Sequence, residues 1–115
     1  MSTFDSLRIA GSGLYSHRKW MDAVSDNIAN IQPPGYLASR TDFESALKSE
    51  LANGERPAVG RGTVAQSLDP TRMDGNNVNL DTETTIATET GLRYQLALNA
   101  LDGKYNVMRT ALRTA

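Results

Sequence analysis

The chain has 115 residues, a formal net charge of −1, one histidine and no cysteine. Its length fits one domain, and its near-neutral charge argues against a nucleic-acid-binding protein, which normally carries a basic patch or stripe. Without cysteine, disulfides and thiolate metal sites are excluded. No apolar run approaches the roughly 18 residues of a membrane span, so we expect no direct span.

Only 6% of the residues are aromatic, so a large core is hard to assemble. Chains with long helical ends and a thin core usually complete their burial by association. Residues 1–10 carry no basic region followed by an apolar core, so we expect no cleavable secretory signal.

The first predicted element is a helix over residues 5–31, preceded by Ser2 and Asp5 at capping-box spacing. Gln32-Pro33-Pro34-Gly35 ends it. Apolar residues recur along it at heptad spacing, in one series of Leu7, Leu14, Met21 and Ile28 and another of Ala10, His17, Val24 and Ile31. Gly11 and Gly13 either loosen its first turns or let a neighbouring helix approach closely.

A loop segment over residues 32–79 follows, with a short helix at 42–52. Thr41 and Glu44 form a second capping-box pair, and Asn53-Gly54 ends the helix. We expect Phe43 and Leu47 to fold back on the long helices. Residues 54–79 show little periodicity, although 63–68 could form one short strand, and connections this long are often functional or disordered when isolated.

The last predicted element is a helix over residues 80–115, capped by Asp81. Its heptad positions include Tyr94, Leu98, Leu101, Tyr105, Met108 and Leu112. At 1.5 Å per residue, the stretch of this helix from about Thr82 to Arg113 is about 48 Å long, more than the width of such a domain, so it needs a partner helix. A neighbouring series (Ala97, Ala100, Val107 and Ala111) is either an intersubunit surface or part of a broad core face.

These elements predict an all-α fold. Two long antiparallel terminal helices form a coiled-coil-like hairpin, with a short middle helix and a long irregular loop. The same seam residues are the predicted assembly and packing residues: Leu7, Leu14, Met21, Val24, Ile28, Tyr94, Leu98, Leu101, Tyr105, Met108 and Leu112.

The titratable residues form no catalytic constellation. His17 lies on the seam and reads as a packing or hydrogen-bonding histidine. Asp81, Glu83 and Glu89 do not cluster with it, so solvated or capping roles are favoured. No residue set offers acid, base and pocket together, so we predict neither an enzyme nor a bound cofactor or metal.

Two stretches resemble bacterial flagellar rod and hook proteins. Asn27-Ile28-Ala29-Asn30, followed by Pro34-Gly35-Tyr36, is similar to the signature at the N-terminal end of that family. Asp74-Gly75-Asn76-Asn77-Val78, with Leu92-Arg93-Tyr94-Gln95, resembles the C-terminal region of the B-type proximal rod proteins (FlgB). The N-terminal segment is as similar to the C type (FlgC). The resemblance covers the first 51 residues and the last 42.

The resemblance implies a structural subunit of the proximal rod of the flagellar basal body. Such a subunit is exported unfolded, without a cleaved signal, and assembles helically into a rod that crosses the periplasm and transmits motor torque. Implied partners are the chain itself, other rod proteins, the rod-to-ring adaptor and the flagellar export gate. The motif residues Asn27, Ala29, Asn30, Pro34, Gly35, Tyr36, Asp74, Gly75, Asn76 and Val78 would fix the end of the first helix and the start of the last.

An alternative from another class is a soluble helical-hairpin adaptor or export chaperone of the flagellar or type III system. Such a protein would be a discrete folded monomer or dimer in dilute solution. Sedimentation of the purified chain separates the two hypotheses.

Overall fold

A computed structural model describes residues 3–42, 44–54 and 63–114. The elements in chain order are α1 (Thr3–Ala29), β1 (Ser39–Asp42), α2 (Glu44–Ala52), β2 (Thr63–Gln66) and α3 (Leu80–Thr114). The molecule is elongated, with principal extents of 66 × 28 × 14 Å. The predicted roles of Ser2 and Phe43 lie outside the described residues, and so does that of the Leu47 side chain.

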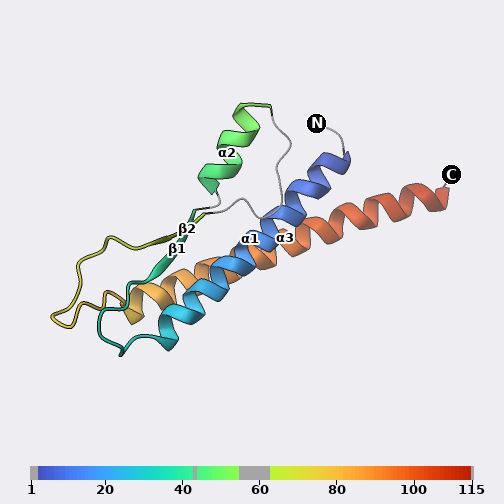
Figure 1. The fold of residues 1–115 in the computed structure, drawn as a ribbon. Helices are drawn as coiled ribbons and strands as arrows, with labels where there is room; N and C mark the ends of the chain where they lie inside the picture. The colour runs from blue at the N-terminus through green and yellow to red at the C-terminus, as the bar shows by residue number, and fades with distance from the viewer. Residues whose placement is uncertain (1–2, 43, 55–62, 115) are drawn as a thin grey trace.

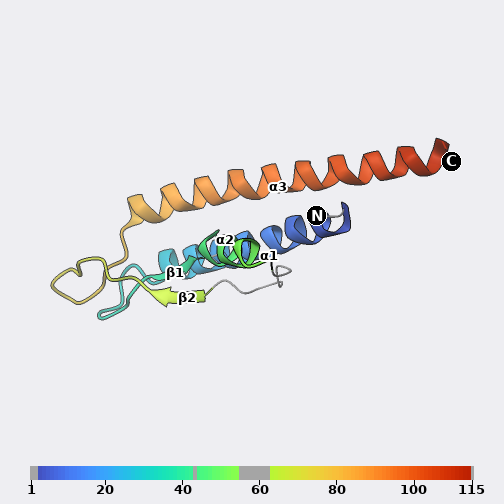
Figure 2. The ribbon, with the colours of Figure 1, turned by 90° about the horizontal axis from the view of Figure 1, so that it is seen from above.

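Helices α1 and α3 lie side by side and antiparallel, with both chain termini at the same end of the molecule (Figure 1, and from above in Figure 2). The buried side chains of this pair are mostly small or polar, and they include Ser12, Ser16, Ala23, Val24 and Thr90. Small side chains permit close packing, but they bury little apolar area. The mainly helical prediction is confirmed, and the core between the two helices is thin.

The residues of α3 that face α1 match only part of the predicted seam. Tyr94, Leu101 and Met108 are partly shielded, while Glu83 and Thr90, with 0% exposure, complete the buried side. Leu98, Tyr105 and Leu112 are 36%, 50% and 77% exposed within the single chain. A straight helix drifts by about 20° per heptad. Leu98 therefore lies off the facing side, and Tyr105 and Leu112 return to it only near the start of α1.

On α1, Val24 is buried and Leu7, Leu14 and Ile28 are partly exposed. Met21 is 38% exposed. The packing of the seam residues between subunits stays a prediction.

A small sheet corrects the all-α prediction. β1 pairs antiparallel with β2, with Ser39 opposite Gln66 and Asp42 opposite Thr63. β1 lies against α1 (Figure 1). The predicted short strand at 63–68 corresponds to β2. β1 was not predicted because its sequence, Ser-Arg-Thr-Asp, has no apolar alternation and one β-branched residue.

The helix caps differ from those predicted. Asn79 Oδ1 accepts the backbone N–H groups of Asp81 at 2.9 Å and Thr82 at 3.3 Å, so Asn79 caps α3 and Asp81 lies in its first turn. In α2, Asp42 Oδ1 accepts the N–H of Ser45 at 3.2 Å, so the cap is one residue after Thr41. Helix α1 ends at Ala29, two residues before the predicted end. Among the described residues, no helix is both long and apolar enough to cross a bilayer.

Candidate functional site: the polar junction between the terminal helices

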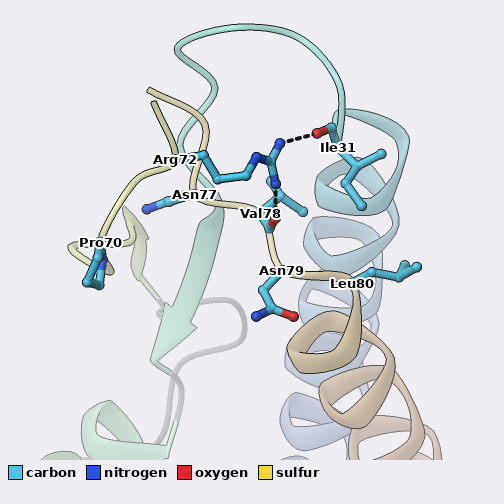
Figure 3. A pocket seen from close by; sticks show the side chains of 7 residues that line it. All are labelled: Ile31, Pro70, Arg72, Asn77, Val78, Asn79 and Leu80. Atoms are coloured by element: carbon cyan, nitrogen blue, oxygen red, sulfur yellow. Dashed lines mark hydrogen bonds between the residues drawn. The ribbon is translucent and has the colours of Figure 1, made fainter. Parts of the chain in front are cut away.

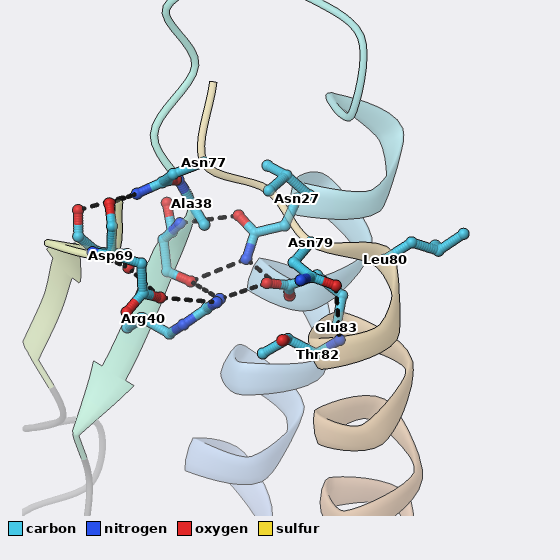
Figure 4. A network of polar contacts seen from close by, with 12 residues as sticks. Asn27, Ala38, Arg40, Asp69, Asn77, Asn79, Leu80, Thr82 and Glu83 are labelled. Atoms are coloured by element: carbon cyan, nitrogen blue, oxygen red, sulfur yellow. Dashed lines mark hydrogen bonds and ion pairs between the residues drawn. The ribbon is translucent and has the colours of Figure 1, made fainter. Parts of the chain in front are cut away.

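The end of α1 and the start of α3 are joined by a hydrogen-bonded network that we call the polar junction (residues 27–40 and 67–83). Asn27 lies at its centre and is 0% exposed. Its Nδ2 donates to the carbonyl of Ser39 at 2.9 Å and to Glu83 Oε2 at 3.0 Å, while its Oδ1 accepts the Ser39 N–H at 2.8 Å (Figure 4). The Tyr36 hydroxyl donates to the same oxygen at 3.4 Å. One amide thus connects α1, β1 and α3.

Glu83 brings a fully buried carboxylate to the junction. Its Oε1 lies 2.6 Å from Arg40 Nη1, and the Arg40 side chain is 26% exposed. Arg40 also lies 3.9 Å from Asp69. A buried carboxylate is tolerated only when it is paired and hydrogen-bonded. Asn27 and Arg40 supply those partners from α1 and β1, so the start of α3 is held by both (Figure 4).

Asn76 holds the turn that follows the end of α1. Its Nδ2 lies within hydrogen-bonding distance of the carbonyls of Asn30 at 2.9 Å, Pro33 at 2.8 Å and Ile31 at 3.3 Å. Its Oδ1 accepts the N–H of Val78 at 2.8 Å, and its side chain is fully buried. These carbonyls belong to the turn after Ala29, and the Asn76 amide, 46 positions beyond Asn30 in the chain, is their shared partner.

Asn77 makes the matching connection on the strand side of the junction. Its Oδ1 accepts the N–H of Ala38 at 2.7 Å, and its Nδ2 donates to the carbonyls of Ser67 at 3.3 Å and Asp69 at 3.2 Å. Its own N–H donates to the carbonyl of Tyr36 at 3.2 Å. The loop after β2 is therefore bonded to the segment before β1.

Two glycines let the two turns of the junction touch. Gly35 and Gly75 have φ values of 75° and 82°, a region in which residues with a Cβ are strained. A Cβ on Gly75 would lie 3.3 Å from the Cα of Gly35. The Gly35 N–H donates to the carbonyl of Asp74 at 2.8 Å. This close backbone contact requires glycine at position 75.

Arg72 holds the two helix ends from the outside. Its guanidinium donates to the carbonyls of Ile31 at 2.5 Å and Val78 at 2.8 Å (Figure 3). It lines a small open cavity of about 270 Å³, formed with Ile31, Pro70, Asn77, Val78, Asn79 and Leu80. Because the guanidinium that lines this cavity also bonds Ile31 and Val78, the cavity belongs to the polar junction.

The junction unites most of the predicted family-motif residues. Those that contribute bonds or the close backbone contact are Asn27, Asn30, Gly35, Tyr36, Asp74, Gly75, Asn76 and Val78. Ala29 and Pro34 lie beside them with exposed side chains. The predicted packing residues are placed elsewhere, along the helices, apart from Ile28 beside Asn27.

Sequence reasoning missed Arg40, Arg72, Asn77 and the role of Glu83. The prediction that Glu83 is solvated or capping is wrong, because Glu83 is 0% exposed and ion-paired. No local sequence pattern marks this role, because its partner Asn27 lies 56 positions earlier in the chain.

His17 lies halfway along α1, away from the junction. Burial, assisted by the positive charge of Arg93, lowers the pKa of its imidazole below the usual value. Its ring stacks on Trp20 with centroids 6.4 Å apart. Within the described residues, no group of three or more histidine and carboxylate side chains could hold a metal ion.

The relatives that match along most of the chain share one name. The flagellar basal body rod protein FlgB of Escherichia coli (strain K12) is 30% identical over 95% of this chain and 94% of its own length. The chain belongs to the FlgB family of flagellar basal body rod proteins. FlgB of Bacillus subtilis (strain 168) is 28% identical over 77% of this chain and 78% of its own length. No family model matches the chain.

A more distant similarity extends to a hook protein. The flagellar hook protein FlgE of Borreliella burgdorferi is 35% identical over 50% of this chain but only 13% of its own length. The rod-and-hook resemblance is thus supported by relatives of both kinds. The similarity to the C-type rod protein stays a prediction. Membership of the FlgB family makes the chain a structural flagellar rod protein and not an enzyme.

Proposed function

We propose that this FlgB-family chain is a subunit of the proximal rod, which assembles helically through α1 and α3 and transmits motor torque. One observation supports helical assembly above the others. Large apolar side chains remain exposed along the whole of α3, including Leu80, Leu92, Leu96, Tyr105, Val107 and Leu112 at 50–77% exposure. Apolar surface of this extent on a soluble chain indicates an interaction surface.

The polar junction gives the subunit its stiffness. Because Asn27, Arg40 and Glu83 tie α1, β1 and α3 together, a twisting force on one helix is passed to the other through charge-assisted hydrogen bonds. Many parallel helix contacts between subunits would share the load, so each contact needs only modest stability.

The location and partners follow from the same proposal. The rod lies in the periplasm, and the chain reaches it through the flagellar export gate without a cleaved signal. Its neighbours are other copies of itself, other rod proteins and the rod-to-ring adaptor. The name shared by the relatives supports the basal body rod as the site of assembly.

Replacement of the gene in its own bacterium tests the proposal. Leu101→Asp and Met21→Asp place a charge in the predicted seam, and we expect both to abolish swimming in soft agar. Asn99→Asp, on an exposed position of α3, is the matched control and should swim normally. Isolated basal bodies should contain the control chain and lack the two seam variants.

Normal swimming by both seam variants would contradict assembly through these faces. Two results together would favour the adaptor or export chaperone. The purified chain would sediment as a discrete dimer that melts cooperatively, and basal bodies isolated from the bacterium would lack the chain.

A further inference from the structure

The face of α3 that contacts α1 continues beyond the start of α1. Asn27 hydrogen-bonds Glu83 across the antiparallel pair, and equal rise in both helices then places Thr3 opposite about residue 107. The remaining turns of α3 project past α1 (Figures 1 and 2). At this end of α3, Tyr105, Met108 and Leu112 share one side of the helix, and Leu112 is 77% exposed. We call these three residues the C-terminal ridge.

The C-terminal ridge lies among basic residues. Lys104, Arg109 and Arg113 outnumber Asp102 between residues 101 and 114. All four are exposed. A partner for this end of α3 should therefore offer an apolar groove with acidic side chains.

The other end of α3 has a surface of that kind, which we call the α3 groove. It has a volume of about 610 Å³ and is lined by Leu80, Asp81, Thr84, Thr85, Thr88, Glu89 and Leu92. Leu80 and Leu92 are 50% and 67% exposed. Asp81 and Glu89 supply the acidic charge, although Glu89 also forms an ion pair with Arg93, with Oε1 and Nη2 2.8 Å apart.

The C-terminal ridge and the α3 groove lie on nearly opposite sides of one helix. Met108 follows Leu92 by sixteen positions, which at 3.6 residues per turn puts them about 160° apart. Two parallel helices that are related by translation must meet through opposite sides. A contact of this kind is heterologous and leaves an open chain of subunits instead of a closed dimer.

We propose that the C-terminal ridge of one copy packs into the α3 groove of a second copy. The inference rests on the proposed function, because it names a contact by which rod subunits join. Ridges of side chains fit grooves between the rows of a neighbouring helix. Arg109 and Arg113 of the first copy then lie on the side of the contact that carries Asp81 of the second copy. The ridge contact extends the α1–α3 interface of the first copy along the same face of its α3.

Disulfide trapping tests the contact, because the chain contains no cysteine of its own. Thr88→Cys in the α3 groove and Leu112→Cys on the C-terminal ridge are produced together in the source bacterium, as two separate chains. Mild oxidation of the isolated basal bodies should give a cross-linked dimer. Thr110→Cys is the matched control, because it lies on the same turns as Leu112 but about 200° round the helix. Thr88→Cys with Thr110→Cys should give no dimer.

The outcomes separate this inference from the proposed function. Basal bodies that contain both cysteine chains without a cross-link would overturn the contact and leave the rod assignment intact. A dimer formed by Leu112→Cys alone would also overturn it, since it would show ridges pairing with each other. If basal bodies lack even the wild-type chain, the proposed function fails.

Discussion

The two ends of the helix pair are built in opposite ways. At the polar junction, Asn27, Asn76 and Glu83 have 0% exposure and bond to groups of the same chain. At the far end, Leu112 is 77% exposed and the described residues of α3 beyond Met108 are all exposed. The first end is complete in one molecule and the second is not. The difference suggests that the junction sets the geometry of the subunit, while the helix ends join it to others.

The largest expected effect comes from the buried carboxylate. Glu83→Ala leaves Arg40 and Asn27 without their partner, and we expect a loss of about 3 kcal/mol in the free energy of unfolding. Glu89→Ala, which removes an exposed pair with Arg93, should cost less than about 0.5 kcal/mol. Urea unfolding followed by circular dichroism measures both. Equal costs would show that the junction is no more stabilising than the helix surface.

Two glycine substitutions should change the stability of the folded chain in opposite directions. Gly75→Ala forces a Cβ into a positive-φ position and towards Gly35, so we expect it to destabilise the chain by about 1–2 kcal/mol. Gly103→Ala, in α3 with open space around it, should stabilise by up to about 1 kcal/mol. Melting temperatures of the two variants check this. A stabilising Gly75→Ala would contradict the close backbone contact.

The exposed helix end should tolerate change in the isolated chain. Leu112→Ser alters a side chain that is mostly exposed to solvent, so the free energy of unfolding should change by less than about 0.5 kcal/mol. Swimming of the variant should nevertheless be reduced if the exposed leucine makes the proposed contact with a neighbouring subunit. A large loss of stability without loss of motility would reverse the proposed roles of the two ends.

The smallest effect is a pH dependence midway between the two ends. The pKa of His17 is lowered by burial and by Arg93, so the unfolded chain binds a proton at a higher pH than the folded one. Stability should therefore fall as the pH drops through the ordinary histidine range. Between pH 7.5 and 5.5 the melting temperature of the wild-type chain should fall slightly more than that of His17→Gln. Identical slopes would contradict the shift.

The sequence predicted the long helices well and the contacts between them poorly. Heptad patterns are local, and α1 and α3 begin and end within about two residues of the predicted bounds. The role of Glu83 is not local, because its partners Asn27 and Arg40 lie more than forty residues earlier in the chain. β1 depends likewise on pairing with β2. The motif residues were located by resemblance, but their mutual bonds became visible only in the structure.

The position of the two termini has a practical consequence for imaging. Both lie at the end of the helix pair where α3 is exposed (Figure 1), so under the proposed assembly a fluorescent protein fused to either terminus would obstruct contacts with other subunits. Met73, on the loop at the opposite end, is fully exposed. A dye attached through Met73→Cys should report on the chain in living cells while the end proposed to contact other subunits stays unmodified.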